Sequence, residues 1–167
     1  MNIRFEMMTA NHTKKVMDIF NDYAENSFAA YPPVKLPYEF YGKFLEMTKG
    51  YPAYVIQNNE DEKVLGFCFL RAYNPLPTFK DTAEATYFID RYATGKGIGK
   101  AALKLLEADA KKLGIKRLLA NISSLNTQSL EFHLRNGFRE CGRLHHIGFK
   151  MGKRFDVVWM EKELINI

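Results

Sequence analysis

A carboxylate, an imidazole and a glycine-rich turn are the groups in this sequence whose types and spacing could do chemistry. Glu84 lies where an apolar stretch begins, and a carboxylate so placed can take a proton from an incoming amine. Asn126, Ser129 and His133 are spaced by three and four residues, so a helix would put all three on one face. Because histidine gains and loses its proton near neutral pH, this face also indicates proton transfer.

The stretch Thr94-Gly95-Lys96-Gly97-Ile98-Gly99-Lys100 holds three glycines within five residues, between an apolar stretch and an amphipathic one. Glycine lets backbone N–H groups approach an anion with no Cβ in the way. The first turn of a following helix adds N–H groups without intrahelical partners, and its dipole favours negative charge. Lys96 and Lys100 add positive charge. The stretch therefore predicts a phosphate-binding turn, with a plain strand-to-helix loop as the alternative.

Two well-known phosphate motifs do not fit this turn. The dinucleotide fingerprint would need its third glycine at Lys100 or Ala102, and no Gly-Lys pair is followed by Ser or Thr as in a P-loop. The turn instead resembles the R/Q-x-x-G-x-G/A turn of the GNAT superfamily of N-acetyltransferases, which holds the pyrophosphate of acetyl-CoA. Thr94, Gly97 and Gly99 occupy its positions, with Thr94 in place of the usual Arg or Gln.

The run from Asn126 to Phe138 resembles the second motif of that superfamily, N-x-x-S/A-x-x-L/F-Y/H-x-x-x-G-F. The resemblance implies that Asn126 hydrogen-bonds the CoA arm, with Ser129 beside it, and that His133 lies near the thioester sulfur. Two alternatives stay open, a helix N-cap for Asn126 and a packing role under the sheet for His133.

Thr82-Ala83-Glu84 resembles the start of the central strand in the phosphinothricin acetyltransferase subfamily, where the glutamate acts as the base. The end of the chain also resembles the last hairpin of that subfamily, through Gly148, Phe149, Lys150, Gly152, Asp156, Val157 and Trp159. The resemblance is good over about residues 82–163 and covers residues 1–81 only in general layout.

The resemblance implies transfer of an acetyl group from acetyl-CoA directly to a primary amine in a ternary complex. Glu84 would take the proton of the amine, directly or through water. Backbone N–H groups near Phe88 or Ile89 would stabilise the oxyanion, and His133 would give the leaving thiolate a proton or a hydrogen bond. The residues expected to bind the cofactor are Tyr87, Phe88, Ile89, Thr94, Gly95, Lys96, Gly97, Ile98, Gly99, Lys100, Asn126 and Ser129.

The acetyl acceptor stays open. In the subfamily a basic side chain before the T-A-E sequence binds the carboxylate of an amino-acid-like acceptor, but residues 73–81 contain no Arg, so Arg71 or Lys80 would have to substitute. Phosphinothricin, methionine sulfone, a polyamine, an aminoglycoside and a protein N-terminus all remain candidates. The residues expected on the acceptor side are Arg71, Tyr73, Phe79, Phe28 and Tyr31, and Tyr38 and Tyr41 either join them or pack in the core.

The length of 167 residues and an apolar fraction of 47% predict one domain, residues 1–167. No run of about 18 apolar residues suggests a membrane span. The start of the chain lacks the basic and apolar segments of a signal peptide. Cys68 and Cys141 fall in expected strands without metal-ligand spacing, which predicts buried, reduced thiols in a cytoplasmic protein. His145 and His146 would point to opposite faces of a strand, so no metal site is expected.

The net charge of +5 is concentrated in residues 91–117, which hold eight basic residues against two acidic ones. Nucleic acid could use such a patch, but a small phosphate-rich ligand explains it more economically, and a solvated helix face is the third reading. We therefore expect a small-molecule amine as partner, no nucleic acid or membrane partner, and a homodimer as an open option. A non-catalytic acyl-CoA sensor on the same fold is the other rival.

Hydrophobic periodicity predicts the element order βααβββαβαββ. The expected strands are 3–8, 53–57, 63–73, 84–90, 115–122, 138–149 and 155–163, and the expected helices are 12–23, 38–48, 97–113 and 127–136. Asn11 is expected to cap the first helix and Gly114 to end the third. The order matches the GNAT fold, an α/β fold whose mixed, mostly antiparallel sheet is flanked by helices. Its central strands splay apart, and CoA enters the resulting wedge.

Overall fold

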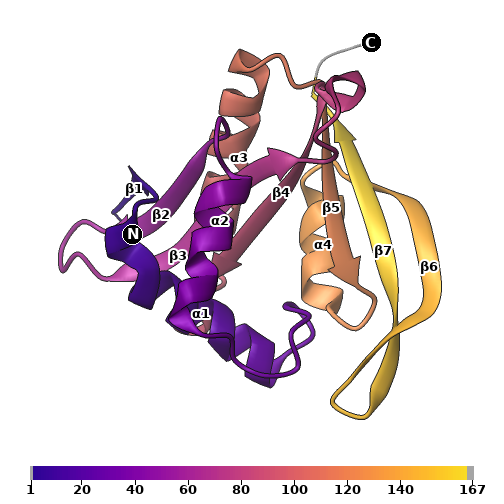
Figure 1. The fold of residues 1–167 in the computed structure, drawn as a ribbon, viewed down its shortest axis with the longest axis horizontal. Coiled ribbons are helices and arrows are strands. Elements are labelled where there is room, and N and C mark those ends of the chain that lie inside the picture. The colour runs from indigo at the N-terminus through magenta and orange to yellow at the C-terminus, as the bar shows by residue number, and fades with distance from the viewer. Residues whose placement is uncertain (1, 165–167) are drawn as a thin grey trace.

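The computed structural model describes residues 2–164 as a seven-stranded sheet with helices on both faces (Figure 1). The elements in chain order are β1 (Ile3–Met7), α1 (Thr13–Asn26), α2 (Tyr41–Met47), β2 (Ala53–Asn58), β3 (Val64–Ala72), β4 (Thr82–Ile89), α3 (Ile98–Lys112), β5 (Arg117–Ser123), α4 (Thr127–Arg135), β6 (Arg139–Lys150) and β7 (Lys153–Glu163). Short 3₁₀ helices are η1 (Ala10–His12), η2 (Tyr38–Phe40), η3 (Pro77–Phe79) and η4 (Arg91–Ala93). The predicted order is confirmed, although the 3₁₀ turns were not foreseen.

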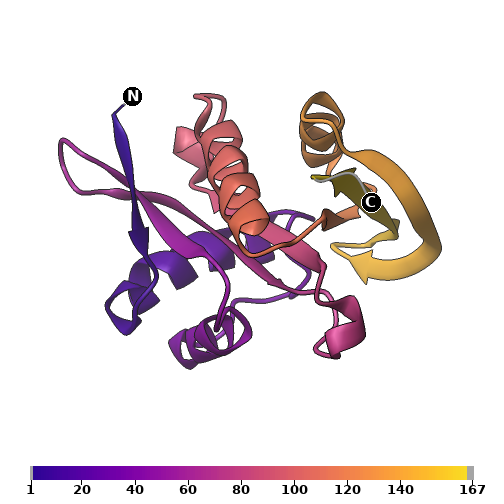
Figure 2. The same ribbon diagram turned by 90° about the horizontal axis from the view of Figure 1, so that it is seen from above.

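The strands lie in the order β1-β2-β3-β4-β5-β7-β6, and every neighbouring pair is antiparallel except β4 and β5. Figure 2 shows α1 and α2 on one face of the sheet and α3 and α4 on the other. β3 is buried on both faces, because Phe67 and Phe69 pack under α1 and α2 while Cys68 and Leu70 pack under α3. This explains the continuous apolar run of its sequence.

The parallel pairing of β4 and β5 lasts for only three residue pairs, the last of which joins Glu84 to Leu119. Beyond it the two strands diverge (Figure 1). β4 stays paired with β3 as far as Ile89, whereas β5 is paired with β7 over its whole length. Each strand therefore follows its antiparallel partner, and the predicted splay of the central strands is confirmed.

The first helix begins differently from the prediction. Asn11 is not its cap, because it lies inside η1. Thr9 precedes that turn, and its backbone N–H donates to Nδ1 of His12 at 3.0 Å. The chain thus enters the helix two residues earlier than expected through a 3₁₀ turn, which leads directly into α1. The end of α3 agrees with the prediction, since Gly114 follows it with a φ of +78°.

The two cysteines differ in exposure. Cys68 is fully buried in β3, and burial raises the pKa of its thiol. Cys141 is exposed, so its predicted burial is wrong. It lies on β6 at the edge of the sheet, where the register with β7 shifts between Glu140 and Gly142. An edge strand with a bulge leaves side chains without a covering layer.

Among the helices of residues 2–164, none is long and apolar enough to cross a membrane.

Candidate active site

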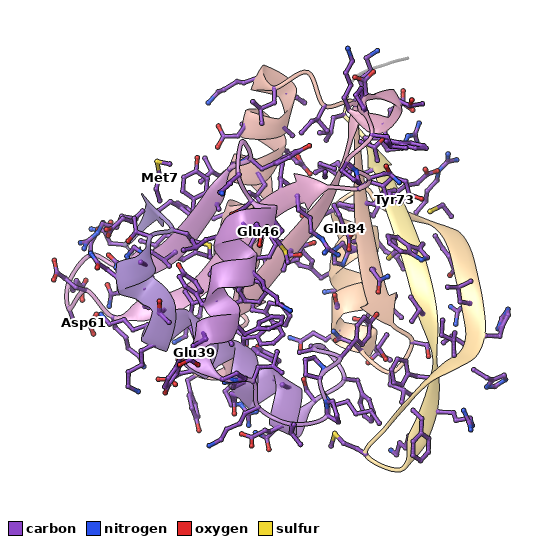
Figure 3. All side chains as sticks on the ribbon, in the orientation of Figure 1. Met7, Glu39, Glu46, Asp61, Tyr73 and Glu84 are labelled. Carbon is purple, nitrogen blue, oxygen red and sulfur yellow. The ribbon has the colours of Figure 1, made fainter. Side chains whose placement is uncertain are left out.

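The divergence of β4 and β5 places the predicted site residues on opposite faces of β4. Glu84 lies where the strands begin to part, with Tyr73 toward β7 (Figure 3). Tyr87 and Ile89 pack with the core on the α3 side, whereas Phe88 packs with the core on the α1 side. Because side chains alternate along a strand, Glu84 shares the face of Phe88. β4 thus carries Tyr87 on the face toward α3 and Glu84 on the face toward α1.

The glycine turn connects β4 to α3 as predicted. Gly95 and Gly97 have φ values of +75° and +81°, which side chains rarely adopt, so glycine is required at both positions. Gly97 is the N-cap of α3, and a Cβ added there would meet no protein atom within 4 Å. Gly99 faces the ring of Phe132 on α4, 3.5 Å from the position of an added Cβ. The first N–H groups of α3 therefore border an open space.

Half of the positive charge in the segment 91–117 is paired with carboxylates. Four basic residues of the segment 91–117 pair with carboxylates: Arg91 with Asp22, Lys112 with Asp109, Lys116 with Asp81, and Arg117 with Glu161. Lys96 and Lys100, at the turn itself, make no salt bridge to any residue of 2–164 and are exposed. Thr94 turns its hydroxyl to the carbonyl of Arg91 at 2.9 Å. Lys104 and Lys111, further along α3, also make no salt bridge to any residue of 2–164, so two of the four unpaired cations lie where a phosphate would bind and two lie along the helix.

The three predicted residues of α4 lie on one face, as their spacing implies. The side-chain oxygen of Asn126 accepts a hydrogen bond from the backbone N–H of Ser129 at 3.3 Å, so Asn126 is the N-cap of the helix. This cap uses only the oxygen, and the Asn126 amide nitrogen has no hydrogen-bond partner within residues 2–164. The capping role is confirmed, and the amide nitrogen stays free for a ligand.

His133 is 3% exposed and both of its ring nitrogens are engaged. Nδ1 lies 2.7 Å from the carbonyl oxygen of Ser129, and since a carbonyl only accepts, Nδ1 carries the proton. Nε2 then accepts from the hydroxyl of Tyr87. Burial lowers the pKa of His133 to about 4 and raises the pKa of Tyr87 well above its usual value. At neutral pH His133 is therefore a neutral imidazole and Tyr87 a protonated phenol. The one ring proton of His133 is on Nδ1 and is bound to the carbonyl of Ser129, so Nε2 has no proton to give.

Of the two expected oxyanion donors, Ile89 faces the splay. The N–H of Asp90 donates to the carbonyl of Leu65 on β3 at 2.7 Å. Because hydrogen-bonded pairs alternate along an antiparallel ladder, Phe88 also directs its N–H toward β3, whereas Tyr87 and Ile89 direct theirs the other way. Beyond Glu84 no strand pairs with that side of β4. Phe88, expected at the cofactor, is a core residue whose ring packs against Phe20 and Phe67.

Glu84 forms an ion pair with Arg71, whose Nη2 lies 2.9 Å from Oε1 of the carboxylate. The Glu84 side chain is 10% exposed and that of Arg71 is 39% exposed. The two residues face each other across β3 and β4, in the register Arg71 to Glu84. The Nε atom of Arg71 is buried without a hydrogen-bond partner among the described residues. The structure therefore brings the predicted base and the predicted acceptor-binding cation together, with one donor of the cation unused.

The loop after α1 brings Phe28 and Tyr31 to the same face. The Tyr31 hydroxyl donates a short hydrogen bond to the side-chain oxygen of Asn121 on β5. Its ring stacks on Phe155 of β7 at 5.9 Å, and Phe28 packs against the same ring at 6.1 Å. Desolvation, followed by the negative charge of Glu84, raises the pKa of Tyr31 to about 12. Asn121 is two residues beyond Leu119, the register partner of Glu84, so Tyr31 bridges the loop to the part of β5 next to Glu84.

The remaining aromatic residues divide between the site and the core. Tyr73 packs edge-on against Phe79 at 5.8 Å and against Trp159 at 6.4 Å, at the end of β3 nearest Arg71. Tyr41 is a core residue, since it is 1% exposed and its hydroxyl donates to the carbonyl of Thr9. Tyr38 hydrogen-bonds Asp18 of α1 instead, so neither of these two belongs to the acceptor side.

Three residues of this face were not predicted from the sequence as part of the site: Asn121, Lys150 and Phe155. Lys150 is one of the residues that resemble the last hairpin of the subfamily, and this could have drawn attention to it. No sequence signal marked Asn121 or Phe155. Among residues 2–164, no three His, Cys, Asp or Glu side chains gather in a way that could hold a metal ion.

The family model and the curated proteins that match this chain all describe acetyltransferases. The family model described as "Acetyltransferase (GNAT) family" matches residues 14–138. A phosphinothricin N-acetyltransferase of Alcaligenes faecalis is 35% identical over 105 residues, which are 62% of this chain and only 53% of that protein. An L-methionine sulfoximine/L-methionine sulfone acetyltransferase of Pseudomonas aeruginosa is 29% identical over 151 residues, 89% of this chain and 87% of that protein.

Solved structures agree with the sequence relatives. The crystal structure of a GNAT superfamily phosphinothricin acetyltransferase from Sinorhizobium meliloti in complex with AcCoA superimposes with a TM-score of 0.90 and 26% identity. That match covers 98% of this chain and 89% of the other.

Proposed function

This chain belongs to the acetyltransferase (GNAT) family, and from that premise we propose that it transfers the acetyl group of acetyl-CoA to the primary amine of an amino-acid-like small molecule. The observation that carries the proposal is the splay of β4 and β5, which has a phosphate-binding turn at one end and a Glu84–Arg71 pair on the acceptor face. Relatives named for phosphinothricin and for methionine sulfone support the substrate class. Transfer is direct, in a ternary complex.

Acetyl-CoA, the co-substrate of the family, supplies the activated acetyl group as a thioester. Its pyrophosphate would occupy the open space before Gly97, where the N–H groups of the first turn of α3 would bind it together with Lys96 and Lys100. The free amide nitrogen of Asn126 would hold the CoA arm. The backbone N–H of Ile89 would hydrogen-bond the thioester carbonyl as it becomes an oxyanion.

Glu84 would take the proton of the acceptor. A lysine-type amine has a pKa of about 10, so it arrives protonated and must lose a proton before it attacks. The ion pair with Arg71 uses one carboxylate oxygen, and the other has no hydrogen-bond partner within residues 2–164. Arg71, whose side chain is 39% exposed, would at the same time bind the carboxylate of the acceptor through the exposed part of its guanidinium. One Arg would thus orient both the base and the substrate.

His133 would act through Tyr87. The neutral imidazole fixes the phenol of Tyr87, which lies on the cofactor face of β4. Tyr87 is itself a residue of β4, the strand whose N–H groups would hold the thioester. His133 is therefore proposed as a positioning residue rather than as the acid that protonates the thiolate.

Replacing His133 with Phe is expected to keep a buried ring but remove the acceptor of the Tyr87 hydroxyl. Loss of one hydrogen bond, about 1 kcal/mol, predicts roughly fivefold slower turnover, with little change in the KM for acetyl-CoA. Because the pKa of His133 is about 4, pH profiles of turnover for the two proteins should run parallel near neutral pH. Unchanged turnover would leave His133 a packing role only. A step near pH 6.5 that the variant abolishes would make it an acid–base group.

A thiol-release assay with purified protein, acetyl-CoA and a panel of amines tests the proposed function. The panel holds phosphinothricin, methionine sulfone, other L-amino acids, a polyamine, an aminoglycoside and a peptide N-terminus. We expect the amino-acid-like acceptors to give the highest kcat/KM. Preference for another amine would overturn the acceptor class, and acetyl-CoA binding without turnover would indicate a sensor. Salt-sensitive affinity for nucleic acid without affinity for acetyl-CoA would overturn the proposal entirely.

A cytoplasmic location and a homodimer remain part of the proposal. The unpaired thiols of Cys68 and Cys141 suit a reducing compartment. β6 is a long strand at the edge of the sheet, and its Leu144 and Ile147 are about half exposed, which suits a second copy. Sedimentation equilibrium would give the mass of the particle, and the mass of a single chain at assay concentration would exclude the homodimer.

A further inference from the structure

Lys150, at the end of β6, is a buried cation that the proposed mechanism does not use. It is 4% exposed, and burial lowers its pKa. No carboxylate lies within salt-bridge distance of it among residues 2–164. Its ammonium donates instead to two backbone carbonyls, those of Ser27 at 2.6 Å and Ala30 at 2.7 Å. Lysine is almost never buried without a charged partner, so the burial of Lys150 needs a structural explanation.

Both carbonyls belong to the loop between α1 and η2, which carries Tyr31. The loop and the β6–β7 hairpin are therefore joined by two charge-assisted hydrogen bonds between residues 123 and 120 positions apart. Without Lys150, these two carbonyls would need water as their hydrogen-bond partner. Lys150 thus fixes the backbone immediately before Tyr31.

Phe155 provides a second attachment of the same hairpin. Its ring is 6% exposed and lies parallel to the ring of Tyr31, with an interplanar angle of 8°. Gly148 is opposite Phe155 in the strand register, and a Cβ at Gly148 would lie 2.1 Å from the ring. Only glycine at position 148 leaves room for the Phe155 ring. The Gly148-Phe149-Lys150 sequence therefore supports both the Lys150 hydrogen bonds and the Phe155 stack. The hydroxyl of Tyr31, bound to Asn121, completes the third attachment of the loop.

We propose that Lys150 is a positioning residue and that the Tyr31–Phe155 stack is the wall that determines which acceptor side chain the site admits. The Tyr31 hydroxyl is bonded to Asn121, two residues beyond Leu119, which is the register partner of Glu84, so the wall borders the position of the reacting amine. Because the wall is fixed at three points, it cannot withdraw from a bulky side chain. The site therefore selects acceptors by the size of their side chains. This inference rests on the proposed function.

Replacing Lys150 with Met removes the ammonium and keeps the length of the side chain. The lost hydrogen bonds should raise the KM for the acceptor about fivefold, while the KM for acetyl-CoA stays at its wild-type value because the glycine turn is remote from this hairpin. Lys153→Met is the matched control, since Lys153 is an exposed lysine on the same hairpin. Equal acceptor KM values in Lys150→Met and the control would remove the positioning role.

Replacing Phe155 with Leu or Ala tests the wall itself, and Leu keeps the test open if Ala or Lys150→Met fails to fold. The measurement is kcat/KM for L-amino acids graded from alanine to tryptophan, with phosphinothricin and methionine sulfone. A wall that sets size predicts that the ratio of tryptophan to alanine rises about tenfold in Phe155→Ala and less in Phe155→Leu. Met151→Ala, which truncates an exposed side chain of the same hairpin, should leave the ratio unchanged.

An unchanged ratio in both Phe155 variants would overturn the inference while leaving the acetyltransferase activity established. If wild-type protein binds acetyl-CoA but acetylates no amine of the series, the proposed function fails, and the inference falls with it. The two failures are distinguishable because the first requires an active wild-type enzyme and the second an inactive one.

Discussion

Replacing Glu84 with Gln is expected to lower turnover roughly 10²–10⁴-fold near neutral pH. Gln keeps the shape of the side chain and its hydrogen bond to Arg71 through the amide oxygen, but it cannot accept the proton of the amine. Acetyl-CoA affinity should hardly change, because the carboxylate lies on the face of β4 away from the glycine turn. The measurement is turnover against pH for both proteins with a saturating amine.

The pH dependence separates a base from a structural ion pair. As pH rises toward about 10, more of the amine arrives already deprotonated, so the variant should recover part of its loss. A Glu84 that only pairs with Arg71 predicts a loss of stability and a pH profile parallel to that of the wild type. Parallel profiles, or a loss confined to acetyl-CoA affinity, would remove Glu84 from the mechanism.

Arg71→Met is the companion variant, because it breaks the same ion pair and leaves the carboxylate in place. If Arg71 binds the acceptor, this change should mainly raise the acceptor KM, whereas Glu84→Gln should mainly lower turnover. Asp81, the other acidic residue near this segment, pairs with Lys116 at 3.4 Å beside the start of β5. It therefore makes a poor substitute for the base.

Replacing Gly97 with Val is expected to weaken acetyl-CoA binding at least tenfold, about 1.4 kcal/mol. The new side chain would enter the open space before the first turn of α3, where no protein atom lies within 4 Å of a Cβ. A steric loss would therefore fall on the ligand rather than on the protein. Calorimetry with acetyl-CoA gives the affinity directly.

Backbone strain needs its own control, because Gly97 has a φ of +81° and any side chain there is strained. Gly114 offers that control at the other end of α3, with a φ of +78° and the same empty surroundings. Gly114→Val should lose a similar free energy of unfolding and keep its acetyl-CoA affinity. Equal affinity of the folded Gly97→Val protein and the wild type would overturn the assignment of the turn.

The parts of the site that the sequence predicted depend on local geometry. A helix fixes which residues share a face, so the spacing of Asn126, Ser129 and His133 was sufficient to align them. The glycines before an amphipathic run predicted a turn that leads into a helix, and Gly95 and Gly97 lie in that turn. The order of the elements followed for the same reason, since apolar periodicity is a property of neighbouring residues.

The tertiary structure decided what these groups can do, because protonation and orientation depend on neighbours that are distant in the sequence. The ladder between β3 and β4 determines that Ile89, and not Phe88, turns its N–H toward the splay. Burial against Tyr87, 46 positions away, makes His133 a neutral imidazole, although the motif only placed it near the sulfur. Lys150, at the end of β6, donates to the carbonyl of Ala30 in the loop before Tyr31, 120 positions earlier in the chain. No local sequence pattern encodes this contact.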